Sequence, residues 1–167
     1  MNKISLRKTV MAALFAAITF VATYFAIPLP ISFGYVNLGD CFVLLGGLLL
    51  GPYGFFSAAL GSILGDILLG FIVYAPATFI LKGSMALIMY FIAGKKYSLI
   101  KLILAAVLSE CIMVIGYFIY ECFVIGLGVS AIANIPYNCF QGVVCATAAI
   151  ILYSVFEKAG LKRKLQL

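Results

Sequence analysis

The sequence contains no histidine, and only 10% of its 167 residues are charged. Without histidine, the chain lacks the commonest metal ligand and the usual general base near neutral pH. It also has no Gly-x-x-x-x-Gly-Lys-Ser/Thr phosphate loop, and its five cysteines include no Cys-x-x-Cys pair. These absences argue against an enzyme, against a resident metal or other cofactor, and against a pump that hydrolyses ATP by itself.

Apolar residues dominate what is present. They make up 66% of the chain, and the mean hydropathy is +1.25. A water-soluble core of this size cannot bury so much apolar surface. Because a membrane-spanning helix takes roughly 20 apolar residues, the length accommodates about six spans and no soluble domain. We therefore predict an all-α integral membrane protein, a single compact bundle of six transmembrane helices over residues 1–167.

Apolar runs separated by prolines, glycines and basic residues give the boundaries of these spans. Proline favours the first turn of a helix and interrupts a helix elsewhere, so it divides neighbouring runs. Asn134 is expected to cap the last helix. The predicted spans are about Thr9–Ile27, Leu38–Leu50, Pro52–Val73, Pro76–Ala93, Leu99–Phe123 and Ile135–Phe156.

The basic residues are unevenly distributed between the two sides of such a bundle. Ten of the eleven Lys and Arg residues fall in the N-terminal, fourth-to-fifth and C-terminal segments, which six spans place on one side. The opposite loops, around residues 28–37, 74–75 and 124–134, contain none. The positive-inside rule then places both termini in the cytoplasm. The net charge of +6 reports this topology in a lipid bilayer and does not indicate nucleic-acid binding.

Two ionisable residues are expected at similar depth on neighbouring helices. Charged groups in hydrocarbon are costly unless they are paired or hydrated, so each is a candidate functional residue. At ~1.5 Å per residue, Asp66 and Lys82 both lie roughly 9 Å below the outer surface. We expect them to pair, either as a purely structural contact or as part of a binding site.

Other polar and aromatic side chains fall in the same outer layer. Asn138 and Gln141 share a helix face at the spacing i, i+3. Tyr117 and Glu121 share a face near the outer end of the fifth span, and Tyr74 lies beside the third-to-fourth loop. This layer predicts a pocket that opens outward, with aromatic walls and a few polar anchors for a small cyclic solute.

Two further acidic residues each allow two interpretations. Asp40, at the start of the second helix, is either a carboxylate that favours a helix N-terminus or another binding residue. Glu110, near the middle of the fifth span, has no basic partner at its expected depth. It is either protonated or hydrogen-bonded to backbone and hydroxyl groups, or it is part of a proton relay.

Small residues recur at four-residue spacing in the first and third helices, and two adjacent glycines lie in the second. In the first helix, Ala12, Ala13, Ala16 and Ala17 form two overlapping patterns of this kind. Small residues four apart let another helix approach closely in lipid. The alanines therefore serve either packing within the bundle or docking of a partner protein, whereas the glycines are expected to serve internal packing. These glycines are Gly46, Gly47, Gly61 and Gly65.

Several stretches together resemble one known family. The matching segments are Gly34-Tyr-Val-Asn-Leu-Gly-Asp40, Leu48-Leu-Leu-Gly-Pro52, Gly61 to Asp66, Tyr74-Ala-Pro76 and Lys82-Gly83, followed by Asn138, Gln141 and the alanine-rich first helix. Over essentially its whole length the chain resembles the substrate-binding S components of energy-coupling factor (ECF) vitamin transporters.

The resemblance implies a membrane-embedded binding subunit of the bacterial cytoplasmic membrane. Such a subunit captures a small water-soluble vitamin or precursor from outside, here with a pyridoxine-like or hydroxymethylpyrimidine-like ring. Its implied partners are a shared transmembrane coupling subunit and two cytosolic ATPases, with the alanine pattern as the docking motif. The first loop, with Phe33, Tyr35 and Asn37, resembles the family's lid over the pocket.

These arguments select one set of candidate binding residues and leave rival functions open. The main alternative is a stand-alone proton-coupled carrier that uses Glu110, Glu121 or Asp66 as its proton site. A membrane enzyme would need a reactive group that the sequence lacks, and a structural assembly factor would need no pocket. The predicted solute-binding residues are Tyr35, Asn37, Asp40, Asp66, Tyr74, Lys82, Tyr117, Glu121, Asn138 and Gln141.

Overall fold

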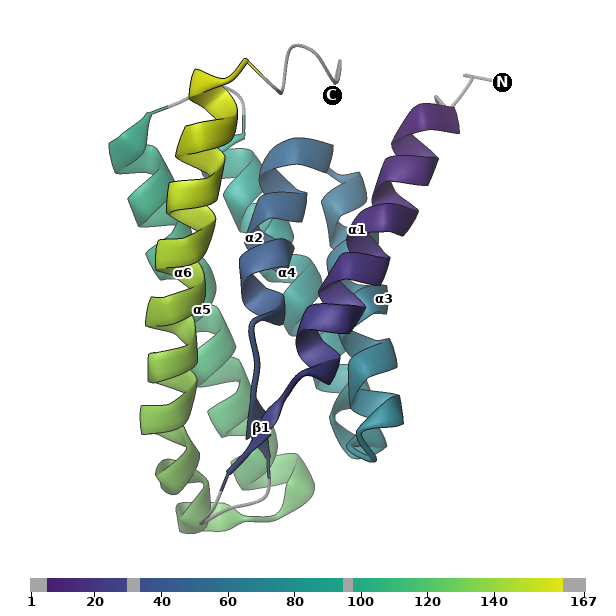
Figure 1. The fold of residues 1–167 in the computed structure, drawn as a ribbon. Coiled ribbons are helices and arrows are strands. Elements are labelled where there is room, and N and C mark those ends of the chain that lie inside the picture. Colours follow the sequence, from purple (N-terminus) through teal and green to yellow (C-terminus); the bar gives the residue numbers. More distant parts are fainter. Residues whose placement is uncertain (1–5, 30–33, 95–97, 161–167) are drawn as a thin grey trace.

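A computed structural model describes residues 6–29, 34–94 and 98–160 of the chain. This described part contains six α-helices and one two-stranded hairpin (Figure 1). The α-helices are α1 (Leu6–Tyr24), α2 (Gly39–Leu50), α3 (Tyr53–Leu68), α4 (Ala75–Ala93), α5 (Leu99–Tyr120) and α6 (Ile135–Lys158). Short segments of other helix types are the 3-10 helices η1 (Ile72–Tyr74) and η3 (Gly128–Asn134) and the π-helix η2 (Glu121–Ile125).

The all-α six-helix bundle predicted from the sequence is confirmed. Four helical segments are long and apolar enough to cross a membrane: α1, α4 with η1, α5 with η2, and α6 with η3. The other two are shorter, since α2 has 12 residues and α3 has 16. At 1.5 Å per residue, α2 is only about 18 Å long, well short of a typical hydrocarbon core of about 30 Å.

The first loop contains a small hairpin that sequence analysis did not predict. Strands β1 (Ile27–Pro28) and β2 (Tyr35–Val36) pair antiparallel, with Ile27 opposite Val36 and Pro28 opposite Tyr35. The first helix ends at Tyr24, three residues before the predicted end at Ile27, because Pro28 disfavours helix in the preceding residue and lacks an amide donor. Phe33, predicted to belong to a lid, lies outside the described residues.

The third helix also ends earlier than predicted. It stops at Leu68 and not near Val73. Gly70 follows with a φ of 83°, a left-handed conformation that glycine adopts without steric cost and that cannot continue an α-helix. The chain then turns through η1 directly into α4, so the residues around Tyr74 lie at the end of the bundle that also carries the hairpin.

Helix α2 lies inside the bundle. Eleven of its 12 residues are buried, and it packs against α1, α3, α4 and α6. The fully buried Leu44, Leu45 and Leu48 of α2 share the core with Met85 of α4 and Met113 of α5. Figure 1 shows α1 on one side of this central helix and α5 and α6 on the other. A helix surrounded by protein in this way need not span the bilayer by itself.

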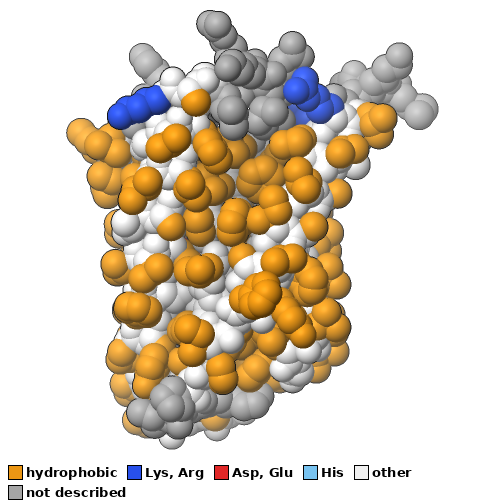
Figure 2. Space-filling model, viewed as in Figure 1, with side chains coloured by type: hydrophobic (Ala, Val, Ile, Leu, Met, Phe, Trp, Pro, Cys, Tyr) orange, Lys and Arg blue, Asp and Glu red, His pale blue; other side chains and the backbone are white. Residues whose placement is uncertain are grey.

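The outer surface separates into an apolar belt and a basic end. Figure 2 shows hydrophobic side chains covering the side of the bundle, with blue basic side chains at one end of the visible face. The exposed basic residues of the described part, Arg7, Lys8, Lys101 and Lys158, belong to the first turns of α1 and α5 and the last turn of α6. The start of α1 and the end of α6 therefore share one end of the bundle (Figure 1).

Two of the glycines expected to serve internal packing permit very close helix contacts. A Cβ atom added at Gly47 would lie 2.1 Å from the Ala86 carbonyl oxygen of α4, and one at Gly61 would lie 2.4 Å from the Ala16 carbonyl oxygen of α1. Both distances are far below van der Waals contact with rigid backbone. Hence α2 approaches α4, and α1 approaches α3, so closely that only the hydrogen side chain of glycine fits at these two positions.

We predict that Gly47→Ala destabilises the protein by about 1–3 kcal/mol, because the new methyl group overpacks the α2–α4 contact. The matched control is Gly46→Ala, where a Cβ meets only the Ser57 hydroxyl at 3.3 Å and a Phe15 ring carbon at 3.7 Å. Both substitutions gain the same helix propensity, so their difference isolates the steric cost. Thermal unfolding in detergent measures it; equal midpoints for the two variants would contradict the close contact.

Candidate functional site

A cavity lies at the end of the bundle opposite the basic end. The segments around it are the hairpin, the end of α3, the start of α4, the end of α5 and the start of α6. Its volume is about 40 Å³, and it is partly open to solvent. The lining residues are Thr23, Leu29, Gly34, Tyr35, Asn37, Ser62, Asp66, Tyr74, Thr78, Lys82, Tyr117, Glu121, Asn134, Asn138 and Gln141.

A buried ion pair forms the inner wall of the cavity. Lys82 Nζ of α4 lies 2.5 Å from Asp40 Oδ1 of α2, and the two side chains are 5% and 0% exposed. The predicted pair between Asp66 and Lys82 is therefore wrong. Because α2 starts well inside the bundle, its N-terminal carboxylate faces α4 at the depth of Lys82. The ammonium group also lies 5.2 Å from the centroid of the Tyr117 ring, within range of a cation–π interaction.

Gln141 connects this ion pair to the hairpin. Its Nε2 donates a hydrogen bond to Asp40 Oδ2 at 2.5 Å, and its Oε1 accepts one from the backbone N–H of Asn37 at 2.7 Å. Asn37 Oδ1 in turn accepts a hydrogen bond from the N–H of Gly39, the first residue of α2, at 2.7 Å. Residues far apart in sequence thus fix the end of the first loop against α2 and α6.

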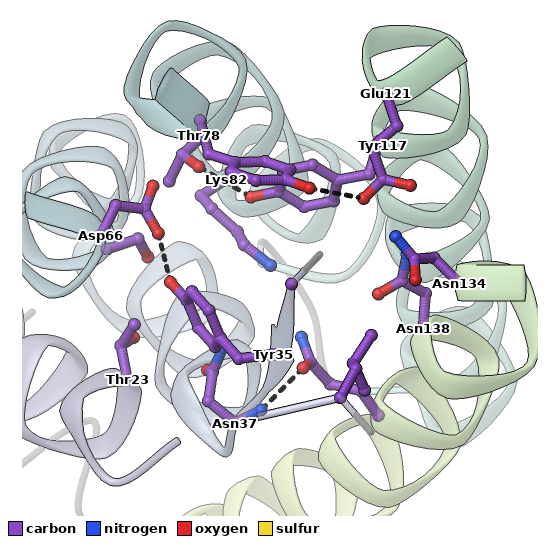
Figure 3. A pocket seen from close by; sticks show the side chains of 15 residues that line it. Thr23, Tyr35, Asn37, Asp66, Thr78, Lys82, Tyr117, Glu121, Asn134 and Asn138 are labelled. Atoms are coloured by element: carbon purple, nitrogen blue, oxygen red, sulfur yellow. Dashed lines mark hydrogen bonds between the residues drawn. The ribbon is translucent and has the colours of Figure 1, made fainter. Parts of the chain in front are cut away.

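Tyr35 of β2 reaches across the cavity to α3. Its hydroxyl donates a hydrogen bond to Asp66 Oδ1 (Figure 3). Its ring centroid lies 5.0 Å from that of Phe71. Burial, together with the adjacent Asp66 carboxylate, raises the pKa of the Tyr35 phenol well above its ordinary value. The phenol therefore remains protonated and acts as a donor to Asp66.

Tyr74 of η1 and Tyr117 of α5, together with Thr78 of α4, form the opposite wall. The Tyr74 hydroxyl donates to Glu121 Oε1 at 3.1 Å, and the Thr78 and Tyr117 hydroxyls are hydrogen-bonded at 2.9 Å. The Tyr74 and Tyr117 ring centroids are 6.0 Å apart in an edge-to-face arrangement. Glu121 belongs to the π-helix η2, a rare element that often marks functional sites. The wall is thus aromatic, with hydrogen-bonding groups at its edges.

The structure brings most of the predicted binding residues together. Nine of the ten line the cavity, while Asp40 lies behind them and holds Lys82 and Gln141. Glu110 is not among the lining residues; it is 7% exposed, and neither carboxyl oxygen has a hydrogen-bond partner in the described part of the chain.

Sequence reasoning missed four polar residues of the cavity: Thr23, Ser62, Thr78 and Asn134. Hydroxyl residues occur throughout membrane helices, so the three Ser and Thr residues carried no distinguishing signal. Asn134 does occupy the N-cap position of α6, as expected, but its side chain makes no capping hydrogen bond and is buried at the cavity. Its position one turn before Asn138 could have indicated a shared face.

The four alanines of α1 divide between two environments. Ala13 and Ala17 are exposed, whereas Ala12 and Ala16 are half-buried, and the Ala16 carbonyl faces Gly61 of α3. Ala12 and Ala16 therefore contribute to packing within the bundle, whereas Ala13 and Ala17 belong to the outer surface of the described helices.

Comparisons with known proteins agree on one family. The family described as "ECF-type riboflavin transporter, S component" matches residues 3–158. A solved structure described as "Structure and mechanism of the S component of a bacterial ECF transporter" superimposes with a TM-score of 0.74 at 26% identity, covering 90% of this chain and 95% of the other. An uncharacterized Pyrococcus woesei protein is 33% identical over 102 residues, which are 60% of this chain and 68% of that protein. The chain belongs to the family of S components of ECF-type riboflavin transporters, and so to the substrate-binding subunits of membrane transporters and not to the enzymes.

Proposed function

We propose that this protein captures a flat heteroaromatic vitamin, or a precursor of one, in the cavity beneath the hairpin. The solute enters from outside the cell, at the end of the bundle opposite the basic residues. A transmembrane coupling subunit and two cytosolic ATPases then drive its delivery to the cytoplasm. The positive-inside rule supports this orientation, since Arg7, Lys8, Lys101 and Lys158 lie at the other end.

The composition of the cavity is the observation that carries the proposal. Tyr35, Tyr74 and Tyr117 offer aromatic surfaces, and Asn138 and Lys82 offer polar groups between them. Aromatic walls with a few convergent polar anchors are typical of sites that bind small cyclic ligands. The family description names riboflavin, and pyridoxine-like and hydroxymethylpyrimidine-like rings present similar flat faces and polar edges.

A stand-alone proton-coupled carrier is the alternative. In such a carrier the proton site and the solute site must be coupled. Glu110, the buried carboxyl group with no hydrogen-bond partner among the described residues, does not line the cavity. Asp66 and Glu121, the other two candidate proton sites, do line the cavity. What favours a binding subunit whose energy comes from partner ATPases is the match to the S components of ECF transporters.

We predict that the purified protein alone binds one molecule of solute with submicromolar affinity. Calorimetric titration in detergent against riboflavin, pyridoxine and hydroxymethylpyrimidine tests this and names the solute. A submicromolar Kd corresponds to more than about 8 kcal/mol of binding free energy, which aromatic walls with several polar anchors can supply. A folded protein that binds none of the three would refute the proposed solute class.

We further predict that Asn138→Ala weakens solute binding about tenfold, the equivalent of one buried hydrogen bond of about 1.4 kcal/mol. The control on the same helix is Thr147→Ala, because Thr147 is exposed and bonds only to the Val143 carbonyl of its own helix among the described residues. Calorimetry with both variants, and thermal unfolding to verify their folding, measures the effect. An unchanged affinity in Asn138→Ala would remove this residue from the site.

Ala13→Trp is expected to leave solute binding intact while abolishing uptake by the assembled transporter. Ala13 is exposed, so an indole adds bulk only to the outer surface where a partner helix would approach. Val107→Trp, at an exposed position of α5, is the matched control and should transport normally. Vitamin uptake into vesicles that contain the complete transporter gives the readout; normal uptake in Ala13→Trp would place the docking face elsewhere.

A further inference from the structure

Two buried carboxylates face the cavity from opposite sides. Asp66 lies on α3 and Glu121 on η2, and each is 3% exposed. Figure 3 shows them on opposite sides of the cavity, with Lys82 and Tyr35 between them. Both residues therefore border the cavity, one at each edge.

Each carboxylate has one oxygen engaged by a tyrosine and one that is not. Tyr35 donates to Asp66 Oδ1, and Tyr74 donates to Glu121 Oε1. Within the described part of the chain, Asp66 Oδ2 and Glu121 Oε2 are buried and accept no hydrogen bond.

Polar neighbours do not use up this acceptor capacity. Thr78 and Asn134 lie close enough to interact with Asp66 and Glu121 respectively. A carboxylate has about four lone-pair sites, so each group still has room for a donor from a ligand. A buried acceptor left without a donor costs free energy, and a ligand that supplies the donor recovers it.

The charges around the cavity limit which ligands it can bind. Lys82 is the only cation among the described lining residues, and its ammonium group is held by Asp40 behind the wall. One lysine thus faces three carboxylates, Asp40, Asp66 and Glu121. The cavity therefore carries an excess of acceptors and negative charge, which disfavours an anionic ligand.

We propose that Asp66 and Glu121 are specificity-determining residues: they accept hydrogen bonds from N–H or O–H groups at two opposite edges of the solute and exclude its phosphate ester. This inference rests on the proposed function, because it concerns the same cavity. It defines the solute class as uncharged heteroaromatic compounds with a donor at each end. The protein thereby distinguishes a free vitamin from the phosphorylated form made inside cells.

Calorimetry of the detergent-purified protein tests the inference with three matched pairs: riboflavin, pyridoxine and hydroxymethylpyrimidine, each against its phosphate ester. For whichever vitamin binds, the wild type is expected to prefer the free form by about 100-fold or more, since like-charge juxtaposition in a buried site is strongly unfavourable. Glu121→Gln and Asp66→Asn keep the side-chain shape and remove one negative charge each. At least one of them should narrow this preference about tenfold or more, by binding the ester more tightly and the vitamin more weakly.

The matched control is Glu157→Gln, which removes a carboxylate near the basic end of α6, far from the cavity, and should leave the preference unchanged. Thermal unfolding verifies that each variant is folded. Equal affinity of the wild type for vitamin and ester would overturn the inference and leave the proposed function standing. A preference that persists in both cavity variants would also overturn it, because the discrimination would then be steric. If no vitamin binds at all, the proposed function itself fails.

Discussion

The ion pair between Asp40 and Lys82 is the constraint on which the rest of the site depends. Both groups lie inside an apolar bundle, where removing one partner of such a pair typically costs about 3–5 kcal/mol. The pair fixes the start of α2 against the middle of α4, and Gln141 adds α6 through its bond to Asp40. Three helices are thus held in one arrangement at the inner wall of the cavity, and the lining side chains take their positions from it.

The same hydrogen-bond network extends to the β1–β2 hairpin above the cavity. Gln141 accepts a hydrogen bond from the Asn37 backbone, Asn37 accepts one from Gly39, and the Cys145 thiol lies 3.5 Å from the Asn37 carbonyl oxygen. The chain leaving the hairpin is therefore anchored on α2 and α6, while Tyr35 itself pairs with β1 and contacts Asp66 and Phe71 through its side chain.

Hydrophobic runs, prolines and glycines were sufficient to predict the six helices and the grouping of the polar residues. Counting residues from the helix ends estimates how deep each side chain lies below the outer membrane surface. This estimate correctly placed Tyr117, Asn138 and Gln141 in one layer. Depth does not give the rotation of a helix about its axis, nor how far a short helix lies from the membrane surface. For these reasons Lys82 was assigned to Asp66 when its partner is Asp40. Asn134 was interpreted as a cap because its local sequence fits one, although tertiary burial decides its role.

The cavity itself follows from a mismatch in helix length. At 12 residues α2 is about 18 Å long, whereas α5 and α6, at 22 and 24 residues, are about 33 and 36 Å. Because α2 is central and ends near the basic side, the missing length falls at the opposite end, where the hairpin lies below α2 in Figure 1. Long helices surround this space, and their polar groups face it because they would be more costly in lipid. A longer α2 would occupy this space; because the helix begins only at Gly39, the space remains for the hairpin and the polar side chains around it.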